Sequence, residues 1–410
     1  MNVTIHPSSL SGTVSAVASK SMAHRLMILN ALAECPSELV CSSTSEDIEA
    51  TRHCLDVLRT SSSPCELECG ESGSTLRFLL PVVGALGKSV RFRRRGRLAQ
   101  RPLAPFDAQL RAHGMHIADD GDDLVVEGQL HGGSFSLPGD VSSQYVSGLL
   151  MAAPLLAEPI EVFVSAPVQS RPYINLTTQA LSKFGVDVVC DRVGMGTSAC
   201  ERFALQPDTL RGPDHLAVEG DWSNSAFWLA AGALEREGLT VSGLDLMSAQ
   251  GDRSILAALA AFGARIARQG GAARATRDTP RAASLDVSAI PDLVPPLTAV
   301  AATVPSTSRF RNAGRLRLKE SDRLATICAA VNAMGGCASI EGDDLLVEGV
   351  KQLTGGEVDA ANDHRIAMMA AVMATHATGP TVVHGSECVA KSYPGFWEDY
   401  RLLGGSVTEG

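Results

Sequence analysis

The pattern of hydrophobic and polar residues predicts two kinds of helix that alternate along the chain, each about six times. The first kind begins at a polar cluster and continues as an Ala- and Leu-rich run that is apolar on all sides, which is typical of a buried helix. These runs cover residues 22–32, 75–86, 145–157, 225–234, 294–304 and 365–375. The second kind is amphipathic and usually ends at Gly, the residue favoured in the left-handed position that closes a helix. These segments cover residues 46–59, 102–114, 172–185, 253–263, 322–335 and 394–404.

Short runs of alternating or β-branched residues separate the helices and predict strands. Examples are residues 123–127, 160–164, 186–190 and 344–348. Successive helices of one kind start about 70 residues apart over most of the chain, so we expect a strand and helix module that is repeated six times. With three modules in each half, the midpoint falls near Asp221, and the buried helices of each half can direct their positive N-terminal ends toward one cleft. The alternative is that Ala-rich helices simply recur, as they do in any large α/β protein.

Length and charge narrow the class of protein and of ligand. A chain of 410 residues exceeds what one hydrophobic core usually supports, so two domains are expected. The content of 45% hydrophobic and 20% charged residues is that of a soluble globular protein. The net charge of -10 argues against nucleic acid or an anionic membrane as a partner, because binding to those polyanions needs a positive field. Local basic clusters in such an acidic protein therefore indicate small anionic ligands.

The ten cysteines are scattered and form no Cys-x-x-Cys pair. Cys65 and Cys69 are the closest couple, and no His is placed to complete a zinc site. We interpret the cysteines as mostly buried thiols of a reducing compartment and expect no metal. The first ten residues have neither a basic leader nor an apolar stretch, and no apolar run approaches 18 residues, so we expect a cytoplasmic protein.

Three clusters place cations beside small polar groups where a helix is predicted to begin. The first contains Lys20, Ser21 and Arg25, the second contains Lys319, Glu320 and Arg323, and the third contains Arg365 after Asn362, Asp363 and His364. A helix start supplies free N–H donors and a positive dipole end, which favour phosphate or carboxylate ligands. Glu320 stands beside one cation and one helical turn from another, so this site can bind an anion and move a proton.

Further polar groups stand at other predicted helix starts, and each has a structural alternative. The segment 70–77 contains Gly73 and is either a backbone anion nest or a plain helix cap. Arg101 precedes a helix start at Pro102 and can bind a phosphate or carboxylate through two hydrogen bonds, whereas most arginines of 91–97 are expected in a solvated strand and loop. Asp292 is either a cap or a base. The remaining candidates are Ser142, Ser143, Gln144 and Ser170, which are either ligand-binding groups or caps.

In order, these segments resemble the 3-phosphoshikimate 1-carboxyvinyltransferase (5-enolpyruvylshikimate-3-phosphate synthase) family of enolpyruvyl transferases, from Ser19 to about Pro394. The resemblance implies an α/β fold, a two-lobed inside-out α/β barrel in which each lobe holds three βαβαββ repeats around buried parallel helices. It implies an N-terminal lobe of residues 20–221, a C-terminal lobe of residues 1–19 and 222–410, and an active site in the cleft between them. The N-terminal strand would join the C-terminal lobe.

The resemblance also implies the reaction. The enolpyruvyl group of phosphoenolpyruvate passes to the 5-hydroxyl of shikimate 3-phosphate by addition and elimination through a non-covalent tetrahedral intermediate, and phosphate leaves. The enzyme would be a monomer of aromatic amino-acid biosynthesis that needs no metal or other cofactor. Asp292 would be the base toward the 5-hydroxyl, Glu320 the acid and base at the methylene carbon, and Lys20 an assistant in proton transfer or phosphate departure.

The implied binding residues divide between the two substrates. The residues for shikimate 3-phosphate are Lys20, Ser21, Arg25, Ser142, Ser143, Gln144, Ser170, Asp292 and Lys319. The residues for phosphoenolpyruvate are Lys20, Gly73, Arg101, Gln144, Arg323, Arg365 and Lys391. The chain departs from the family at Glu71 and Arg315, where the family often has Asn, so the roles of these two residues are open.

Two other functions fit parts of the pattern. A UDP-N-acetylglucosamine 1-carboxyvinyltransferase has a similar fold and chemistry but typically carries a reactive Cys in the loop that here covers residues 91–101, and this segment has none. A catalytically inactive protein that binds phosphorylated ligands is a different class. The presence of both Asp292 and Glu320 argues against it, because binding alone does not require the two carboxylates.

Overall fold

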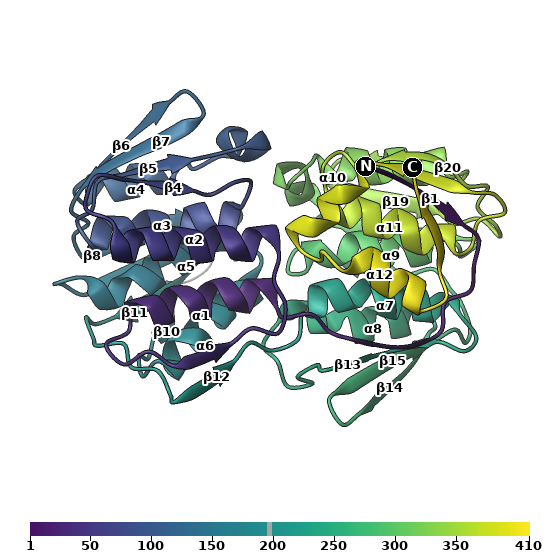
Figure 1. Ribbon diagram of the computed structural model, residues 1–410, viewed down its shortest axis with the longest axis horizontal. Helices are drawn as coiled ribbons and strands as arrows, with labels where there is room; N and C mark the ends of the chain where they lie inside the picture. The colour runs from purple at the N-terminus through teal and green to yellow at the C-terminus, as the bar shows by residue number, and fades with distance from the viewer. Residues whose placement is uncertain (195–198) are drawn as a thin grey trace. The chain divides into compact units, whose positions relative to one another are not determined.

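The computed structural model describes residues 1–194 and 199–410, and its contacts divide the chain into two compact units (Figure 1). The N-terminal unit consists of Lys20–Ser42 and Glu46–Val218. The C-terminal unit consists of Met1–Ser19, Ser43–Ser45 and Glu219–Gly410. The chain therefore starts in the C-terminal unit, builds the N-terminal unit and returns.

Helices fill the interior of the N-terminal unit. Three are nearly apolar on all sides, and in α3 twelve of the thirteen residues are buried. Gly148 of α5 allows close packing against α3, because a Cβ atom there would lie 2.5 Å from the carbonyl oxygen of Arg77. The buried helices are α1 (Lys20–Leu32), α3 (Gly73–Ala85) and α5 (Ser143–Ala152). The other helices are α2 (Glu46–Thr60), α4 (Phe106–Ala112) and α6 (Arg171–Lys183).

Two four-stranded sheets and one two-stranded sheet belong to the N-terminal unit. The first has the order β4-β5-β7-β6, with β4 (Cys65–Glu68), β5 (Val90–Arg93), β6 (Met115–Asp120) and β7 (Asp123–Gly128). The second has the order β10-β11-β9-β8, with β8 (Gly133–Pro138), β9 (Ile160–Ser165), β10 (Val189–Val193) and β11 (Cys200–Leu205). The third pairs β3 (Glu38–Val40) in parallel with β12 (His215–Ala217).

The C-terminal unit repeats this helical interior. Every residue of α7 and of α11 is buried, as expected for helices that are apolar on all sides. The buried helices are α7 (Trp222–Leu234), α9 (Val294–Ala301) and α11 (His364–Ala374). The other helices are α8 (Ile255–Ala261), α10 (Arg323–Ala333) and α12 (Phe396–Leu402).

Three four-stranded sheets belong to the C-terminal unit, and the chain start contributes to two of them. The first has the order β20-β21-β1-β22, with β1 (Asn2–His6), β20 (Gly356–Asp359), β21 (Thr381–His384) and β22 (Ser406–Glu409). The second has the order β14-β15-β13-β2, with β2 (Gly12–Ser15), β13 (Leu239–Ser242), β14 (Arg265–Gln269) and β15 (Ala272–Thr276). The third has the order β16-β17-β19-β18, with β16 (Ser284–Asp286), β17 (Thr307–Arg311), β18 (Cys337–Glu341) and β19 (Asp344–Glu348).

All five four-stranded sheets share one pairing pattern. One outer strand pairs in parallel with its neighbour, and the remaining two pairings are antiparallel, as in β4, β5, β7 and β6. A parallel pair requires a crossover, and a buried helix supplies it, such as α3 between β4 and β5. The predicted fold class is confirmed, with helices inside and open sheets outside: the C-terminal unit has three such sheets, and the N-terminal unit has two together with the parallel pair of β3 and β12.

The strand predicted at residues 186–190 is misplaced. The structure has β10 at Val189–Val193 instead. Gly185, with φ of +81°, ends α6, and the Val186 N–H then bonds the carbonyl of Leu181 at 3.1 Å. Val186 therefore belongs to the closure of the helix, and its β-branched side chain is buried there rather than in a sheet.

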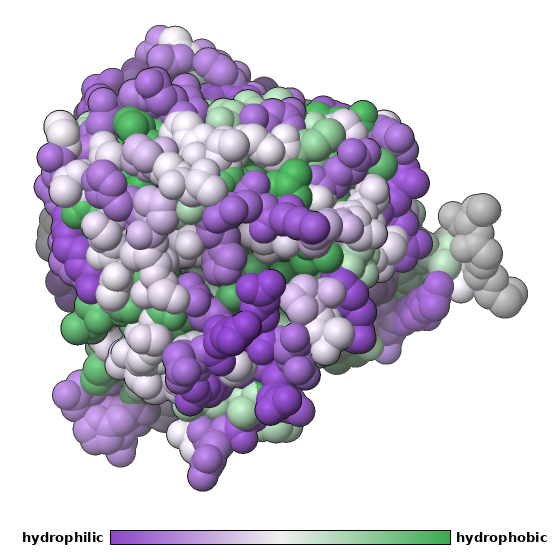
Figure 2. Space-filling model, turned by 90° about the vertical axis from the view of Figure 1, so that its right-hand side faces the viewer, coloured by the Kyte–Doolittle hydropathy of each residue, from purple (hydrophilic) through white to green (hydrophobic). Residues whose placement is uncertain are grey.

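One face of the surface and the lengths of the helices can be examined directly. On the face shown in Figure 2, hydrophilic and hydrophobic residues are interspersed. In the described parts of the chain, the search for a helix that is both long and apolar enough to cross a membrane finds none.

Candidate active site

Arg323 is the centre of a charged cluster in the C-terminal unit. It is the first residue of α10 and only 1% exposed. Its guanidinium donates to Asp292 Oδ1 at 3.0 Å, to Glu320 Oε2 at 2.5 Å, and to both carboxylate oxygens of Asp363 at 2.7 and 3.2 Å. These carboxylates come from three separate segments, so one buried cation fixes three helix starts relative to one another.

Asp292 lies in η5 (Pro291–Leu293), directly before α9. Its side chain caps no helix. It accepts hydrogen bonds from Lys319 at 3.1 Å, from Arg323, and from Arg365 at 3.2 Å. The capping interpretation is therefore wrong, because the carboxylate turns toward three cations instead of toward backbone N–H groups.

These cations determine the charge of Asp292. Burial raises its pKa, but Arg365, Lys319 and Arg323 outweigh burial and hold the pKa well below the ordinary value. For Lys319, burial lowers the pKa, and the attraction of Asp292 opposes this only in part. Asp292 is therefore ionised at neutral pH, and each of its oxygen atoms is bound by a cation.

Asp363 is a residue of this site that the sequence reasoning missed. It is fully buried, forms the two-oxygen contact with Arg323, and accepts from Ser321 Oγ at 3.0 Å. It also caps α11 by accepting the N–H of Arg365 at 3.0 Å. Its position before the helix in the third cation cluster was the available signal, since Asp is a favoured cap.

Lys391 is connected to the same cluster through Asn362, the residue before Asp363. Lys391 ends η7 (Ser386–Lys391), and its Nζ donates to the carbonyl oxygen of Asn362 at 2.8 Å. Asn362 has φ of 55°, a left-handed conformation in which Asn is tolerated. The structure thus brings together five predicted residues of this unit, namely Asp292, Lys319, Glu320, Arg323 and Arg365, and ties Lys391 to the loop before Asp363.

A second buried carboxyl lies near Asp292. Asp252, in η4 (Gly251–Ser254), is 2% exposed and accepts a hydrogen bond from Ser223 Oγ. Burial, and then the charge of Asp292, raise the pKa of Asp252 to about 6, against the effects of Ser223 and Arg365. Nothing in the sequence pattern distinguished this Asp from a surface residue.

Lys20 and Arg25 both lie on α1 of the N-terminal unit. Lys20 begins the helix and forms an ion pair with Asp47 at 2.8 Å. Arg25 is 2% exposed and donates to Thr177 Oγ1, Ser147 Oγ and two carbonyl oxygens, all of them uncharged. Burial lowers the pKa of Arg25 to about 9. The sequence reasoning missed Asp47, the second residue of α2.

Gly73 opens α3, and two guanidinium groups lie against it. A Cβ atom at Gly73 would be 2.5 Å from Arg77 NH1 and 2.7 Å from Arg101 NH1. Ser72 caps the helix by accepting the N–H of Thr75 at 3.2 Å. Both readings of segment 70–77 therefore have support: the cap is present, and cations stand at the helix start.

Arg77 links this helix start to α5, and the sequence reasoning missed it. It is 3% exposed and donates to Gln144 Oε1 and to the carbonyl of Pro102, each at 3.2 Å. Gln144 in turn donates to Ser74 Oγ at 3.0 Å. The structure thus brings Gly73, Arg101 and Gln144 together around Arg77. Arg77 is the only charged residue in the apolar run 75–86, which was a usable signal.

The remaining candidate hydroxyls differ in their local roles. Ser142 caps α5 by accepting the N–H of Gln144 at 3.2 Å, and Ser143 is the first residue of that helix. Ser170 precedes α6 in a left-handed conformation with φ of 54°, and its side chain does not cap the helix. Ser21 is the second residue of α1, and its carbonyl oxygen accepts a hydrogen bond from Arg25 at 2.5 Å.

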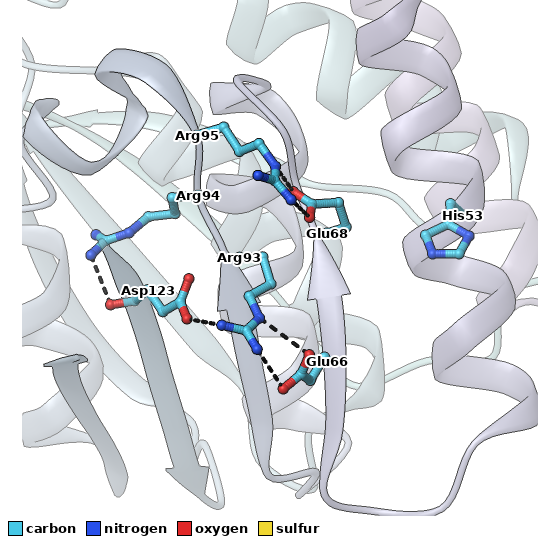
Figure 3. A pocket seen from close by; sticks show the side chains of 7 residues that line it. All are labelled: His53, Glu66, Glu68, Arg93, Arg94, Arg95 and Asp123. Atoms are coloured by element: carbon cyan, nitrogen blue, oxygen red, sulfur yellow. Dashed lines mark hydrogen bonds and ion pairs between the residues drawn. The ribbon is translucent and has the colours of Figure 1, made fainter. Parts of the chain in front are cut away.

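The arginines of residues 91–97 are largely neutralised by carboxylates (Figure 3). Arg93 binds Glu66 and Asp123, and Arg95 binds Glu68 at 2.8 Å. They belong to a polar pocket lined by His53, Glu66, Glu68, Arg93, Arg94, Arg95 and Asp123. The expectation of a solvated strand and loop is confirmed for Arg93 and Arg95 and wrong for Arg94, which is 6% exposed because it bonds the carbonyls of Asp122 and Asp123.

Glu71 and Arg315, the two residues that depart from the family pattern, have different neighbours. Glu71 turns toward η1 (Gly96–Gln100), and a Cβ atom at Gly96 would lie 2.5 Å from the Glu71 carboxyl carbon. Arg315 lies in η6 (Gly314–Leu318) and is one of the cations that lower the pKa of Lys319.

The expectation for cysteines is partly wrong. All ten are free thiols, but only Cys54, Cys65, Cys69 and Cys388 are buried. Exposed positions such as Cys35 follow a helix end or lie in edge strands, where apolar patterning says little about burial. Among the described residues, no group of three His, Cys, Asp or Glu side chains is arranged to hold a metal ion.

The fold defines the class of protein. The structure is similar to a 2.37 Å structure of EPSP synthase from Acinetobacter baumannii, with a TM-score of 0.77 and 23% identity over the whole of both chains. It is also similar to the enolpyruvyl transferase NikO from Streptomyces tendae, with a TM-score of 0.75 and 17% identity over 99% of this chain and 98% of that one. The chain thus has the fold of the enolpyruvyl transferases.

Sequence comparison identifies the family within this class. The family model of EPSP synthase (3-phosphoshikimate 1-carboxyvinyltransferase) matches residues 5–400. A 3-phosphoshikimate 1-carboxyvinyltransferase of Clostridium kluyveri is 36% identical over 99% of this chain and 98% of its own length, and one of Clostridium perfringens is 37% identical over 98% of both. The chain belongs to the EPSP synthase family, a family of transferases, and the resemblance stated from the sequence is confirmed.

Proposed function

We propose that this protein transfers the enolpyruvyl group of phosphoenolpyruvate to the 5-hydroxyl of shikimate 3-phosphate and releases phosphate, as a step of aromatic amino-acid biosynthesis. The family supports this reaction. The observation that carries the proposal for this chain is the placing of Asp292 and Glu320 on the same buried Arg323. A site that only bound anions would need the cations but neither carboxylate.

We propose the following binding residues for the two substrates. Shikimate 3-phosphate is bound by Lys20, Ser21, Arg25, Ser142, Ser143, Gln144, Ser170, Asp292 and Lys319. Phosphoenolpyruvate is bound by Lys20, Gly73, Arg101, Gln144, Arg323, Arg365 and Lys391. Seven of these residues are cations, and they offset the roughly six negative charges that the two substrates carry. Arg25 supports this assignment because its four hydrogen bonds go to uncharged oxygen atoms, so no carboxylate among the described residues neutralises it.

The proposed chemistry begins at the methylene carbon of phosphoenolpyruvate. Glu320 donates a proton to this carbon, the adjacent carbon becomes electrophilic, and the 5-hydroxyl oxygen adds to it while Asp292 takes the hydroxyl proton. The product is a tetrahedral ketal phosphate. Glu320 then removes a proton from the methyl group, the C–O bond to phosphate breaks, and the enol ether forms. Lys20 assists by donating a hydrogen bond to the departing phosphate.

The cations around Asp292 explain how a weakly basic carboxylate can serve as the base. In the absence of ligand, Lys319, Arg323 and Arg365 bind its oxygen atoms and lower its pKa. Anionic substrates compete for the same cations, which reduces their effect on Asp292 and raises its affinity for a proton. In this proposal the base becomes effective only when the substrates are bound.

The setting of the reaction follows from the same residues. One chain carries every residue in the proposal, so we propose a monomer that acts on small molecules without a cofactor. Free thiols such as Cys35 and Cys190 at exposed positions suit a reducing compartment, and we propose that the protein is cytoplasmic.

An acceptor comparison tests this function. Purified protein is given phosphoenolpyruvate with either shikimate 3-phosphate or UDP-N-acetylglucosamine, and released phosphate is measured. Release with shikimate 3-phosphate alone is expected. Release only with the nucleotide sugar would indicate the related transferase, and release with neither would favour a binding protein without catalytic activity.

A further inference from the structure

A row of four hydrogen-bonding side chains crosses the interior of the N-terminal unit, from α1 to the start of α3. His24 Nδ1 lies 2.7 Å from Thr51 Oγ1. Thr51 Oγ1 lies 2.6 Å from Thr75 Oγ1, and Thr75 Oγ1 lies 2.7 Å from Ser72 Oγ. None of the four residues is more than 1% exposed. The proposed mechanism gives no role to any of them.

The direction of these hydrogen bonds can be read from the Ser72 end. Ser72 Oγ accepts the N–H of Thr75 and, at 2.7 Å, its hydroxyl hydrogen, for which the carbonyl of Asp47 at 3.5 Å is the more distant acceptor. A hydroxyl group has one hydrogen, so Thr75 Oγ1 must accept from Thr51. Thr51 has then used its own hydrogen and must accept from His24. Every bond therefore points from the imidazole toward Ser72.

The His24 end gives the same direction independently. Burial, and then the charges of Lys20 and Arg25, lower the pKa of His24 well below its ordinary value, so the ring is neutral and has one N–H. Among the described residues Nε2 has no hydrogen-bond partner, whereas Nδ1 has Thr51. A buried N–H without an acceptor is rarer and costlier than an unused lone pair. The hydrogen is therefore on Nδ1, which makes His24 the first donor.

The row of hydrogen bonds ends at Ser72, next to the proposed phosphoenolpyruvate site. Ser72 satisfies the N–H of Thr75, the third residue of α3. The N–H groups of Gly73 and Ser74, the first two residues, point out of the helix start, where an anion is favoured. The guanidinium groups of Arg77 and Arg101 lie against the same Gly73. The position of Ser72 thus sets the position of the backbone donors.

We infer that His24, Thr51, Thr75 and Ser72 are positioning residues for phosphoenolpyruvate, and that their one-way hydrogen-bond chain holds the first turn of α3 in its anion-binding shape. This inference rests on the proposed function. A turn fixed before the ligand arrives need not be ordered on binding, so the chain acts on affinity for this substrate. Most residues proposed for shikimate 3-phosphate lie outside this turn, although Gln144 contacts it through Ser74, so the affinity for that substrate should change much less.

Paired substitutions at Thr51 test the inference. Thr51→Val removes the hydroxyl link and keeps the shape, whereas Thr51→Ser keeps the hydroxyl. In phosphate-release kinetics, Thr51→Val, which removes both hydrogen bonds of the Thr51 hydroxyl, is expected to raise KM for phosphoenolpyruvate at least about fivefold. KM for shikimate 3-phosphate should stay within about twofold of the wild type, and Thr51→Ser should restore the phosphoenolpyruvate value.

Two further variants separate positioning from folding. Thr75→Val breaks the same chain one link closer to Ser72 and should reproduce the KM effect if Thr51→Val fails to fold. Thr60→Val is the control on α2, because Thr60 is exposed and its hydroxyl donates to the carbonyl of Asp56 in the same helix. If the wild type is active, two results would overturn the inference and leave the proposed function standing. One is an unchanged KM for phosphoenolpyruvate in both Thr51→Val and Thr75→Val. The other is an equal rise in the KM values of the two substrates. A wild type without phosphate release would overturn the proposed function and the inference with it.

Discussion

Glu320 is the residue on which the proposed proton transfers depend. Its side chain is 23% exposed and its carboxylate contacts Arg323 at 2.5 Å. Arg323 therefore fixes the position of the carboxylate, and a ligand can still reach it. Glu320→Gln keeps the size and the hydrogen-bonding ability but cannot give and recover a proton. We expect kcat to fall about 10²- to 10⁴-fold while both KM values change less than about threefold, as measured by phosphate release at saturating substrates.

A matched exposed glutamate provides the control for this prediction. Glu341 also contacts an arginine, Arg309, but its side chain is 59% exposed and lies in β18. Glu341→Gln should leave kcat and both KM values unchanged. If Glu320→Gln lost turnover and binding to the same extent, the assigned acid and base role would be wrong.

Gly73 permits two arginines to approach the start of α3, and this closeness can be tested. In Gly73→Ala the new Cβ atom must displace the guanidinium groups of Arg77 and Arg101. We expect KM for phosphoenolpyruvate to rise at least about tenfold, equal to about 1.4 kcal/mol of lost binding, with little change for shikimate 3-phosphate. Gly395→Ala is the control, because the nearest atom to its Cβ is 4.0 Å away. An unchanged KM in Gly73→Ala would show that this helix start does not bind the substrate.

Asp252 predicts a pH dependence of stability. The pKa of Asp252 is raised to about 6 by burial and by Asp292, above the ordinary value of 3.8. Protonated Asp252 therefore favours the folded state at low pH, and this contribution is lost as the pH rises from about 4 to about 6. The Asn side chain of Asp252→Asn does not titrate. The unfolding free energy of this variant, relative to that of the wild type, should therefore rise by as much as about 3 kcal/mol between pH 4 and pH 7. Urea unfolding at four pH values measures this difference, and a constant difference would contradict the assignment.

At the scale of single residues, the sequence predicted groups that stand in polar clusters and missed those that act through other groups. Lys319, Glu320 and Arg323 were predicted because cations and a carboxylate adjoin at a helix start. Asp363 and Arg77 were missed because their importance comes from contacts with residues 40 and 67 positions away. Such contacts depend on how helices pack, and the local sequence marked Asp363 only as a helix cap and Arg77 only as a charge in an apolar run.

At the scale of elements, Asp363 joins two helix starts, since it caps α11 and binds the first residue of α10. Asp363→Asn keeps a capping oxygen but removes the charge that balances the buried Arg323. We expect the unfolding free energy to fall by about 2 to 3 kcal/mol. This loss is small for a broken buried ion pair, because Asp292 and Glu320 still contact Arg323. Denaturant unfolding measures this loss, and KM for phosphoenolpyruvate should rise as well.

The neighbouring helix cap serves as the comparison. Asp322 caps α10 by accepting the N–H of Ala325 at 3.2 Å, but its side chain is 41% exposed. Asp322→Asn should cost less than about 0.5 kcal/mol and should not affect substrate binding. Equal losses in the two variants would mean that Asp363 contributes only a cap.

Elements were predicted best where burial is complete. The run that is apolar on all sides at residues 225–234 lies in α7, and the run at residues 365–375 lies in α11 except for its last residue, because only a buried helix tolerates such a sequence. The start of α4 was predicted at Pro102, but the helix begins at Phe106. The carbonyl of Pro102 instead binds Arg77 and Tyr145, and this contact is made outside the local segment.

At the scale of the whole molecule, the first strand of the chain is an interior strand of a distant sheet. β1 lies between β21 and β22, and Ile5 is fully buried there. Ile5→Ala should destabilise the C-terminal unit by about 2 to 4 kcal/mol. Hydrogen exchange should increase in β20, β21 and β22 and not in the sheets of the N-terminal unit.

The exposed neighbour His6 is the control for this change. His6→Ala removes a side chain from the same strand without opening a cavity, so exchange should stay as in the wild type. Equal protection in Ile5→Ala would contradict the pairing of β1 with the C-terminal strands. The repeat of modules was predictable because each one repeats its helix pattern, whereas the pairing of residues 2–6 with residues near 384 and 409 was implied only by family resemblance.

The central claim, enolpyruvyl transfer to shikimate 3-phosphate, is tested most directly by identifying the product. Purified protein is incubated with phosphoenolpyruvate and shikimate 3-phosphate, and the organic product is analysed by mass spectrometry alongside the released phosphate. We predict a shikimate 3-phosphate that has gained one carboxyvinyl group, formed in a one-to-one ratio with phosphate and absent with Glu320→Gln on the same time scale. Phosphate release without this product, or an unmodified acceptor after prolonged incubation, would contradict the account.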